Sequence, residues 1–257
     1  MLATAGAALV AFQAQANSTL GYNVSGGDLL LDFRPTGGGS YDVTIDLGNY
    51  STMISSAVGG VVNLNSWVPV VTGVEGSLSS LNWSVGGQDN QLGGDVWATR
   101  TAPGNVAGTS TPWLNESAAQ NAAADVAIES TGANGVTHGT TLVAGAARTS
   151  DGSAYSYAHF TGSGNWGGHF QGNTENATGV GFTGSAISVE DLYFDDQNAT
   201  GGTPATYLGS FVLGGDGTLS FDVASSPVVP EPMTYGLLSG LGLLAVSLRQ
   251  QIRRLRA

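Results

Sequence analysis

The 257-residue chain contains no cysteine and no lysine, and only 10% of its residues are charged. The lack of cysteine excludes disulfide bonds, thiolate zinc sites and thiol nucleophiles. All cationic residues are arginines, and only Arg34, Arg100 and Arg148 precede the last nine residues. A nucleic-acid binder needs clustered cations that displace counterions from phosphate groups. Nucleic acid is therefore not expected among the partners of this protein.

The balance of charge is acidic. The formal net charge is −12, and residues 17–226 hold 18 of the 19 acidic residues against three arginines, which leaves −15. Such a charge keeps a protein soluble and repels polyanions, so it favours a neutral or cationic polymer, or divalent cations, over an acidic polysaccharide. The 41% hydrophobic content exceeds that of disordered acidic chains, and the 40 glycines lack the collagen period. The composition indicates one folded domain with terminal segments attached.

The N-terminal segment has the pattern of an export signal. Residues 1–16 carry no charge and run through small and apolar positions before Ala14-Gln15-Ala16. This order, an apolar region followed by an A-x-A site, is typical of a secretory signal peptide cleaved at Ala14 and Ala16. The basic region that normally precedes the apolar stretch is missing, which favours a misplaced start codon. The alternative is a buried N-terminal helix, which would show polar positions at helical spacing.

The C-terminal segment, residues 227–257, combines three different elements. Pro230, Glu231 and Pro232 are followed by an uncharged run at 233–248 and then by four arginines: Arg249, Arg253, Arg254 and Arg256. As a helix the run spans about 24 Å, which is slightly short for a bilayer. The arginines orient such a helix with the tail in the cytoplasm and the preceding domain outside. An ordinary membrane anchor would explain the helix and the arginines but not the proline box.

This tail, VVPEPMTYGLLSGLGLLAVSLRQQIRRLRA, resembles a PEP-CTERM sorting signal, in which the same three elements occur in the same order. The one visible departure is Met233, where serine is usual. The resemblance implies a bacterial exported protein that a membrane-embedded exosortase cleaves near the Pro-Glu-Pro box. The strings GDLLLDFR, DVWATR, STPW and TYLGSFVLGGDGTLSF also resemble uncharacterised exported domains that carry this tail. That second resemblance implies no activity.

The exported segment, 17–226, shows the alternating pattern of β-strands. In residues 41–47 apolar and polar positions alternate, and the same holds for 29–33, so that 28–47 is predicted to form a hairpin. A second hairpin is predicted at 205–213 and 218–223, around a glycine-rich turn. Weaker strands are predicted at 81–85, 95–100, 155–160, 168–171 and 189–194. Short strands at this spacing favour an antiparallel β-sandwich or a jelly-roll-like domain.

One helix is predicted at residues 111–130, where Thr111 would be the N-cap and Pro112 the first helical residue. Its apolar positions recur every four residues, so we expect it to pack against a sheet. The expected fold is therefore mainly β, with one packed α-helix and a C-terminal transmembrane helix.

Candidate metal ligands are few. The three histidines, His138, His159 and His169, include no closely spaced pair, so no metal site is expected from them. Acidic and amide side chains offer the oxygen ligands that calcium prefers: Asp191, Asp195, Asp196, Asn198 and Asp216. Their spacing matches no EF-hand. We expect no cofactor, with one structural calcium ion at these loops as the alternative.

Two kinds of side chain bear on carbohydrate chemistry. A glycosidase needs two carboxylates across a cleft, and the available glutamates are Glu75, Glu116, Glu129, Glu175 and Glu190. A flat row of tryptophans could instead stack on sugar rings, from Trp67, Trp83, Trp97, Trp113 and Trp166. Trp83 lies on the apolar face of a predicted strand, and we expect it and most of the others in the core.

The expected function is that of a non-enzymatic exported protein of the cell envelope or extracellular matrix; its association with exopolysaccharide is what the resemblance of the tail implies. Its expected route crosses the inner membrane, where an exosortase-type enzyme processes it before it reaches the cell surface or the medium. The alternatives are a carbohydrate-binding module and a secreted glycan hydrolase. The module requires exposed tryptophans, and the hydrolase requires a cleft with paired carboxylates and one perturbed pKa.

Overall fold

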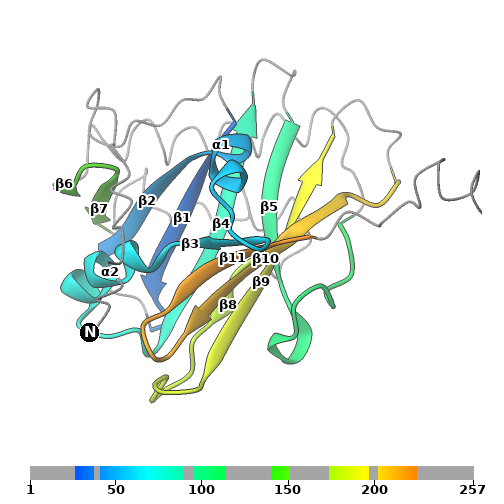
Figure 1. Cartoon of the computed structure of the whole chain (residues 1–257). Coiled ribbons are helices and arrows are strands. Elements are labelled where there is room, and N and C mark those ends of the chain that lie inside the picture. The colour runs from blue at the N-terminus through cyan, green and yellow to red at the C-terminus, as the bar shows by residue number, and fades with distance from the viewer. Residues whose placement is uncertain are drawn as a thin grey trace, which may run out of the picture. The chain divides into compact units, whose positions relative to one another are not determined.

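A computed structural model of the chain describes residues 27–37, 41–89, 95–113, 140–150, 174–196 and 202–224. Contacts divide the chain into two units, Met1–Ala224 and Ser225–Ala257, and every described residue belongs to the first. The described part is mainly β, as predicted, and its strands pair antiparallel (Figure 1). The strands are β1 (Asp28–Pro35), β2 (Tyr41–Asn49), β3 (Val61–Asn63), β4 (Leu81–Asp89), β5 (Asp95–Thr101), β6 (Thr140–Val143), β7 (Ala146–Ser150), β8 (Asn176–Ala177), β9 (Ile187–Asp195), β10 (Thr206–Gly214) and β11 (Leu219–Val223).

Both predicted hairpins are confirmed. Strands β1 and β2 pair antiparallel, with Leu31 opposite Ile45 and Phe33 opposite Val43. Strands β10 and β11 pair likewise, with Phe211 opposite Phe221. In both hairpins the alternating apolar residues enter the core, because successive side chains of a strand point to opposite faces.

Three of the weaker strand predictions are also confirmed, as parts of β4, β5 and β9. The sequence analysis missed β3, β6, β7 and β8, which are short and have little alternation of their own. The strands predicted at 155–160 and 168–171 lie outside the described residues.

The described strands form one curled sheet with the order β3-β11-β10-β9-β5-β4-β1-β2-β7-β6, and β8 pairs with β4 beside this path. The sequence analysis expected two packed sheets or a jelly roll, whereas the hydrogen bonding of the described strands is continuous. One hydrophobic cluster nevertheless joins side chains from the two halves of the path, such as Leu31 and Ile45 from one half and Phe211 and Phe221 from the other. The curl of the sheet lets distant strands share one core.

Aromatic residues make up much of this core. The Phe33 and Trp83 rings stack with centroids 6.1 Å apart, and the Phe211 and Phe221 rings lie 4.5 Å apart. All four side chains are at most 1% exposed. The Trp83 indole donates to the Ser188 hydroxyl at 2.8 Å, so its one polar atom is satisfied inside the core.

Two short α-helices that the sequence analysis did not predict connect the strands. Helix α1 (Tyr50–Ser55) begins after Asn49, whose side-chain oxygen accepts from the backbone N–H groups of Ser51 and Thr52. Helix α2 (Val68–Glu75) has a proline in its first turn and ends at Gly76, whose φ is 77°. Thr111 to Trp113, which should begin the predicted helix, are not helical here, and residues 114–130 lie outside the described part.

Gly209 offers a direct test of strand packing. It follows an irregularity in the β9–β10 register and has a φ of 145°. A Cβ there would meet the Asp222 carbonyl oxygen at 2.3 Å. We expect Gly209→Ala to lower the free energy of unfolding by roughly 2 kcal/mol or more, because both the backbone and the neighbouring strand would have to shift. Chemical denaturation measures this change.

Gly73 provides the matched control. It lies inside α2, and a Cβ there would meet nothing within 4 Å. Gly73→Ala should raise the free energy of unfolding by about 0.5–1 kcal/mol, because alanine is the better helix former. Equal effects of the two substitutions would contradict this assignment of close packing at Gly209.

Candidate functional site

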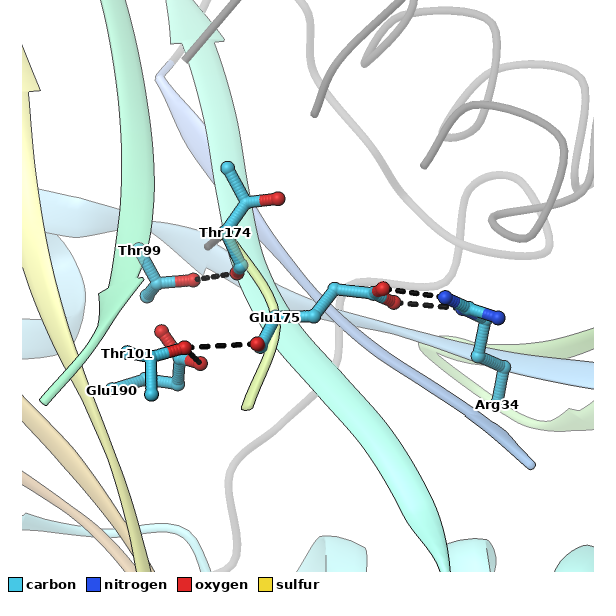
Figure 2. Close-up of polar contacts among 6 residues, drawn as sticks. All are labelled: Arg34, Thr99, Thr101, Thr174, Glu175 and Glu190. Carbon is cyan, nitrogen blue, oxygen red and sulfur yellow. Dashed lines mark hydrogen bonds and ion pairs between the residues drawn. The ribbon is translucent and has the colours of Figure 1, made fainter. Parts of the chain in front are cut away.

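The most elaborate polar site lies where the sheet splits between β4 and β5. These strands pair only from Gly86 opposite Ala98 to Asp89 opposite Asp95. The rest of β4 pairs with β8 instead, through Asn82 and Trp83. Six residues meet at this split, and we call them the junction: Arg34, Thr99, Thr101, Thr174, Glu175 and Glu190 (Figure 2). Thr174 and Glu175 belong to the segment that leads into β8, and the other four come from neighbouring strands.

Two threonines of β5 connect the separated strands. The Thr99 hydroxyl accepts from the Val85 backbone N–H at 2.9 Å and lies 3.2 Å from the carbonyl oxygens of Val85 and Thr174. The Thr101 hydroxyl donates to the Glu175 carbonyl at 2.8 Å and lies 3.3 Å from Glu190 Oε1. These side chains replace the backbone hydrogen bonds that β4 and β5 no longer form with each other, as buried backbone groups require.

The Glu175 side chain turns away from these threonines toward β1 (Figure 2). Arg34 Nε donates to Glu175 Oε1 at 2.7 Å, and Arg34 Nη2 donates to Oε2 at 2.5 Å. The two side chains are only 21% and 16% exposed. A bidentate pair of this kind fixes direction as well as distance, so it sets the position of the segment before β8 against β1.

Glu190 lies at the junction with no access to solvent. Burial raises the pKa of its carboxyl well above the usual range, and the charges of Glu175 and Asp191 add to this effect, while hydrogen bonds to Thr101 and Thr99 oppose it. Its Oε2 atom has no hydrogen-bond partner in the part of the chain described. Burial therefore favours the protonated, neutral form of the Glu190 carboxyl.

A second acid, Asp32 of β1, is also buried. Burial raises its pKa to about 7; the Thr44 hydroxyl, which donates to Oδ1 at 2.5 Å, opposes the shift, and the Glu175 charge adds to it. Its other carboxyl oxygen has no partner among the described residues. The fold thus raises the pKa of two buried acids near one Arg34–Glu175 pair.

Asp191, a candidate calcium ligand, has a structural role instead. Its two oxygens accept from the backbone N–H groups of Gly108 and Ser110 at 2.8 and 2.9 Å, and from the Ser110 and Ser210 hydroxyls at 2.7 and 2.6 Å. Four donors satisfy this fully buried carboxylate. Asp191 holds the loop after β5 against β9 and β10.

The other candidate cation ligands in the described part are Asp195 at the end of β9, Asp196 directly after it, and Asp216, and they form no metal-binding cluster with Asp191. Asp216 lies in the turn between β10 and β11, where hydrogen bonds from the Thr218 hydroxyl and N–H lower its pKa. Within the described ranges, no three acidic or histidine side chains are arranged to hold a metal ion. Asn198 and all three histidines lie outside those ranges.

The structure brings together two of the five glutamates considered for hydrolysis, Glu175 and Glu190. Arg34 occupies both oxygens of Glu175, and Glu190 has no exposed surface. Glu75 lies on α2, and Glu116 and Glu129 lie outside the described part. The sequence gives no sign of the Arg34–Glu175 pair, because 141 positions separate its members.

The tryptophans are mostly core residues. Trp83, Trp97 and Trp113 are at most 7% exposed, which confirms the expectation for Trp83. Trp67 is half-buried, and Trp166 lies outside the described residues. Among the described residues there is no row of exposed indole rings for a sugar to stack on.

The terminal predictions fall on residues outside the described part: Ala14, Ala16, Pro230, Glu231, Pro232, Arg249, Arg253, Arg254, Arg256 and the run at 233–248. Among the helices that the structure describes, none has the length and apolarity to cross a membrane. No family model, curated protein or solved structure matches the chain.

The junction predicts a specific contribution from the Thr101 hydroxyl. Thr101→Val keeps the shape of the side chain but leaves the buried Glu175 carbonyl without its donor. We expect a loss of about 1–2 kcal/mol in the free energy of unfolding. Thr101→Ser, which restores the hydroxyl, should recover most of this loss. Equal unfolding midpoints for the two variants in urea would contradict the role of the hydroxyl.

The buried acids predict a pH dependence. Unfolded Asp32 ionises near its ordinary pKa of 3.8, whereas the folded protein holds the proton to about pH 7. The folded state binds more protons in this interval, so the free energy of unfolding should fall as the pH rises from about 4 to 7. The shift corresponds to a loss on the order of 4 kcal/mol, complete above pH 7. Denaturation at a series of pH values measures it.

Asp32→Asn should flatten that pH profile without abolishing its slope, because burial also raises the pKa of Asp46 to about 7. The matched control is Asp216→Asn. The pKa of Asp216 is lowered, so its contribution is present above pH 4 and is lost only at lower pH. The control should leave the slope between pH 4 and 7 unchanged. An unchanged slope in Asp32→Asn would show that Asp32 does not hold the proton.

Proposed function

We propose that this chain is an exported, non-enzymatic protein of the cell envelope or extracellular matrix, sorted by an exosortase-type enzyme through its C-terminal segment. One observation carries the proposal: the Pro-Glu-Pro box at 230–232, the uncharged run at 233–248 and the four terminal arginines occur in this order. The three elements differ in physical type, so a bias in composition toward apolar or basic residues does not produce them together.

Physical chemistry gives each element a task. The apolar run is long enough to enter a bilayer but short of a stable span, which suits a transient anchor. The arginines keep the tail in the cytoplasm, so the domain before it faces outward across the inner membrane. The box then lies at the outer side of the run, where a membrane-embedded enzyme can reach it. The acidic charge of residues 17–226 keeps the released domain soluble.

The contacts at the junction support a non-enzymatic role for the described part. A glycan hydrolase requires two carboxylates that reach the substrate on opposite sides of the scissile bond. Glu175 is bound by Arg34, and Glu190 has no solvent contact. Both contribute to holding the sheet together, and we propose that this is their function.

The burial of the tryptophan side chains helps to decide how the protein would associate with a carbohydrate partner. We propose exopolysaccharide as the companion of the mature protein, from the resemblance of the tail. A dedicated carbohydrate-binding module would need exposed aromatic rings, and the described tryptophans are buried or half-buried. We therefore favour a matrix protein whose acidic surface coexists with the polymer over a module with a tryptophan platform.

The proposal also covers how the strands are layered and what the C-terminal segment forms. We propose that the curled sheet forms a sandwich-like or jelly-roll-like domain over residues 17–226, with a transmembrane helix at 233–248. The shared hydrophobic core supports two layers, because Val43 of β2 and Phe221 of β11 belong to one cluster although the strands lie far apart in the sheet order. A curled sheet whose halves pack on each other produces this arrangement.

The sorting proposal predicts a processed protein. In the producing cell, intact mass spectrometry of the exported protein should show loss of both the leader and the segment after the Pro-Glu-Pro box. Glu231→Ala should leave the C-terminal segment attached and the protein in the membrane fraction. Met233→Ser, which restores the usual residue of the signal, is the matched control and should be processed normally. A mature exported protein that still carries Arg253 and Arg254 would overturn the sorting proposal.

A further inference from the structure

A shallow groove of about 420 Å³, open to solvent, lies between α2 and the hairpin of β6 and β7. Its walls are the aliphatic side chains of Pro69, Val70 and Val74 from α2 and of Leu142 and Val143 from β6. Arg148 of β7 is the one charged side chain that lines it. The groove is therefore an aliphatic surface with a single cation.

Helix α2 explains why this surface is apolar. Val68 and Val71 point into the core and are buried, and Val70 and Val74 are half-buried and pack against the same core. Pro69 and Gly73, which are exposed, complete the apolar outer side of the helix. A surface helix normally places polar residues on its outer side. An outer face of proline, valine and glycine exposes apolar area that an apolar partner would cover.

Arg148 is unusual among the described arginines. Arg34 pairs with Glu175, and Arg100 donates to the Thr111 carbonyl at 2.7 Å. Arg148 packs its guanidinium over the Tyr41 ring, 4.6 Å from the centroid, and its Nε is buried without a hydrogen-bond partner. No salt bridge of Arg148 occurs within the described ranges, although the chain is strongly acidic. A carboxylate is the group that a guanidinium recognises best.

The rest of the lining indicates what such a carboxylate would be attached to. Apart from the guanidinium, the lining side chains have no hydrogen-bonding group. The lining side chains would leave the hydroxyls of a sugar without hydrogen-bond partners, which is unfavourable. A hydrocarbon chain has no such groups and gains from every methylene that it buries.

We propose that this groove binds an aliphatic carboxylate, with its hydrocarbon chain along α2 and β6 and its carboxylate on Arg148. The ligand class is an unbranched fatty acid. This site is independent of the sorting segment, so it stands or falls separately from the function proposed above.

The test is calorimetric titration of the purified exported protein, after removal of its C-terminal segment, in detergent-free buffer with hexanoate, octanoate and decanoate below their micellar concentrations. We expect saturable binding at one site, with affinity that rises about twofold to fourfold per added methylene. Octylammonium, which has the same chain and the opposite charge, should bind at least tenfold more weakly than octanoate. No saturable binding, or equal affinity for the two octyl compounds, would overturn the proposal.

Two variants locate the site. Arg148→Gln should weaken octanoate binding about tenfold and abolish the preference over octylammonium. Gly73→Leu should prevent binding by filling the groove, because a side chain at Gly73 enters open space. Gly179→Leu, also at an open glycine but outside the groove, is the matched control and should bind normally.

Gly73→Leu keeps the test decisive even if Arg148→Gln folds poorly, because position 73 is exposed and its substitution needs no repacking. Octanoate binding that survives in Gly73→Leu would place the ligand elsewhere and overturn the assignment. Binding of an apolar acidic peptide by a chain that does not bind octanoate would assign the groove to a protein partner and overturn the hydrocarbon ligand.

Discussion

Backbone pairing between β4 and β5 ends at Gly86, and the remaining contacts of the described sheet depend on how this split is closed. β8 covers the free edge of β4, and the Thr99 and Thr101 hydroxyls supply hydrogen bonds where strand pairing no longer can. The Arg34–Glu175 pair fixes the same segment against β1. With the split closed in this way, the two halves of the sheet can curl over one hydrophobic core without leaving buried backbone groups unpaired.

This closure places acidic groups where water cannot reach them. Burial raises the pKa of the Glu190 and Asp32 carboxyls, because it disfavours their charged forms, and the charge of Glu175 adds to both shifts. Glu175 stays bound to Arg34 beside them. Two neighbouring carboxyls in different environments would suggest acid–base catalysis if they lined an open cleft. Here the pair is structural, because one member is fully buried and the other is fully engaged by a guanidinium.

The groove beside α2 shows the opposite arrangement, an apolar surface left accessible with a cation that lacks a carboxylate partner. Within one acidic domain, Glu175 is paired with Arg34, whereas Arg148 packs over the Tyr41 ring and is the cation of the proposed ligand site. The proposed sorting segment adds a third chemistry, that of an apolar run followed by arginines. These features occupy separate parts of the chain and can be tested one at a time.

The sequence by itself determined the strands with clear alternation, because a period of two residues follows directly from strand geometry: the β1–β2 and β10–β11 hairpins, β4, β5 and β9. It also determined the tail motif, which is local in the chain. The sequence could not predict β8, because its two residues form a strand only through their pairing with Asn82 and Trp83 of β4. Nor could it predict α2, whose valines favour strands, or the Arg34–Glu175 pair across 141 positions. Only the tertiary structure decided these features, because each depends on partners that the fold brings together from distant parts of the chain.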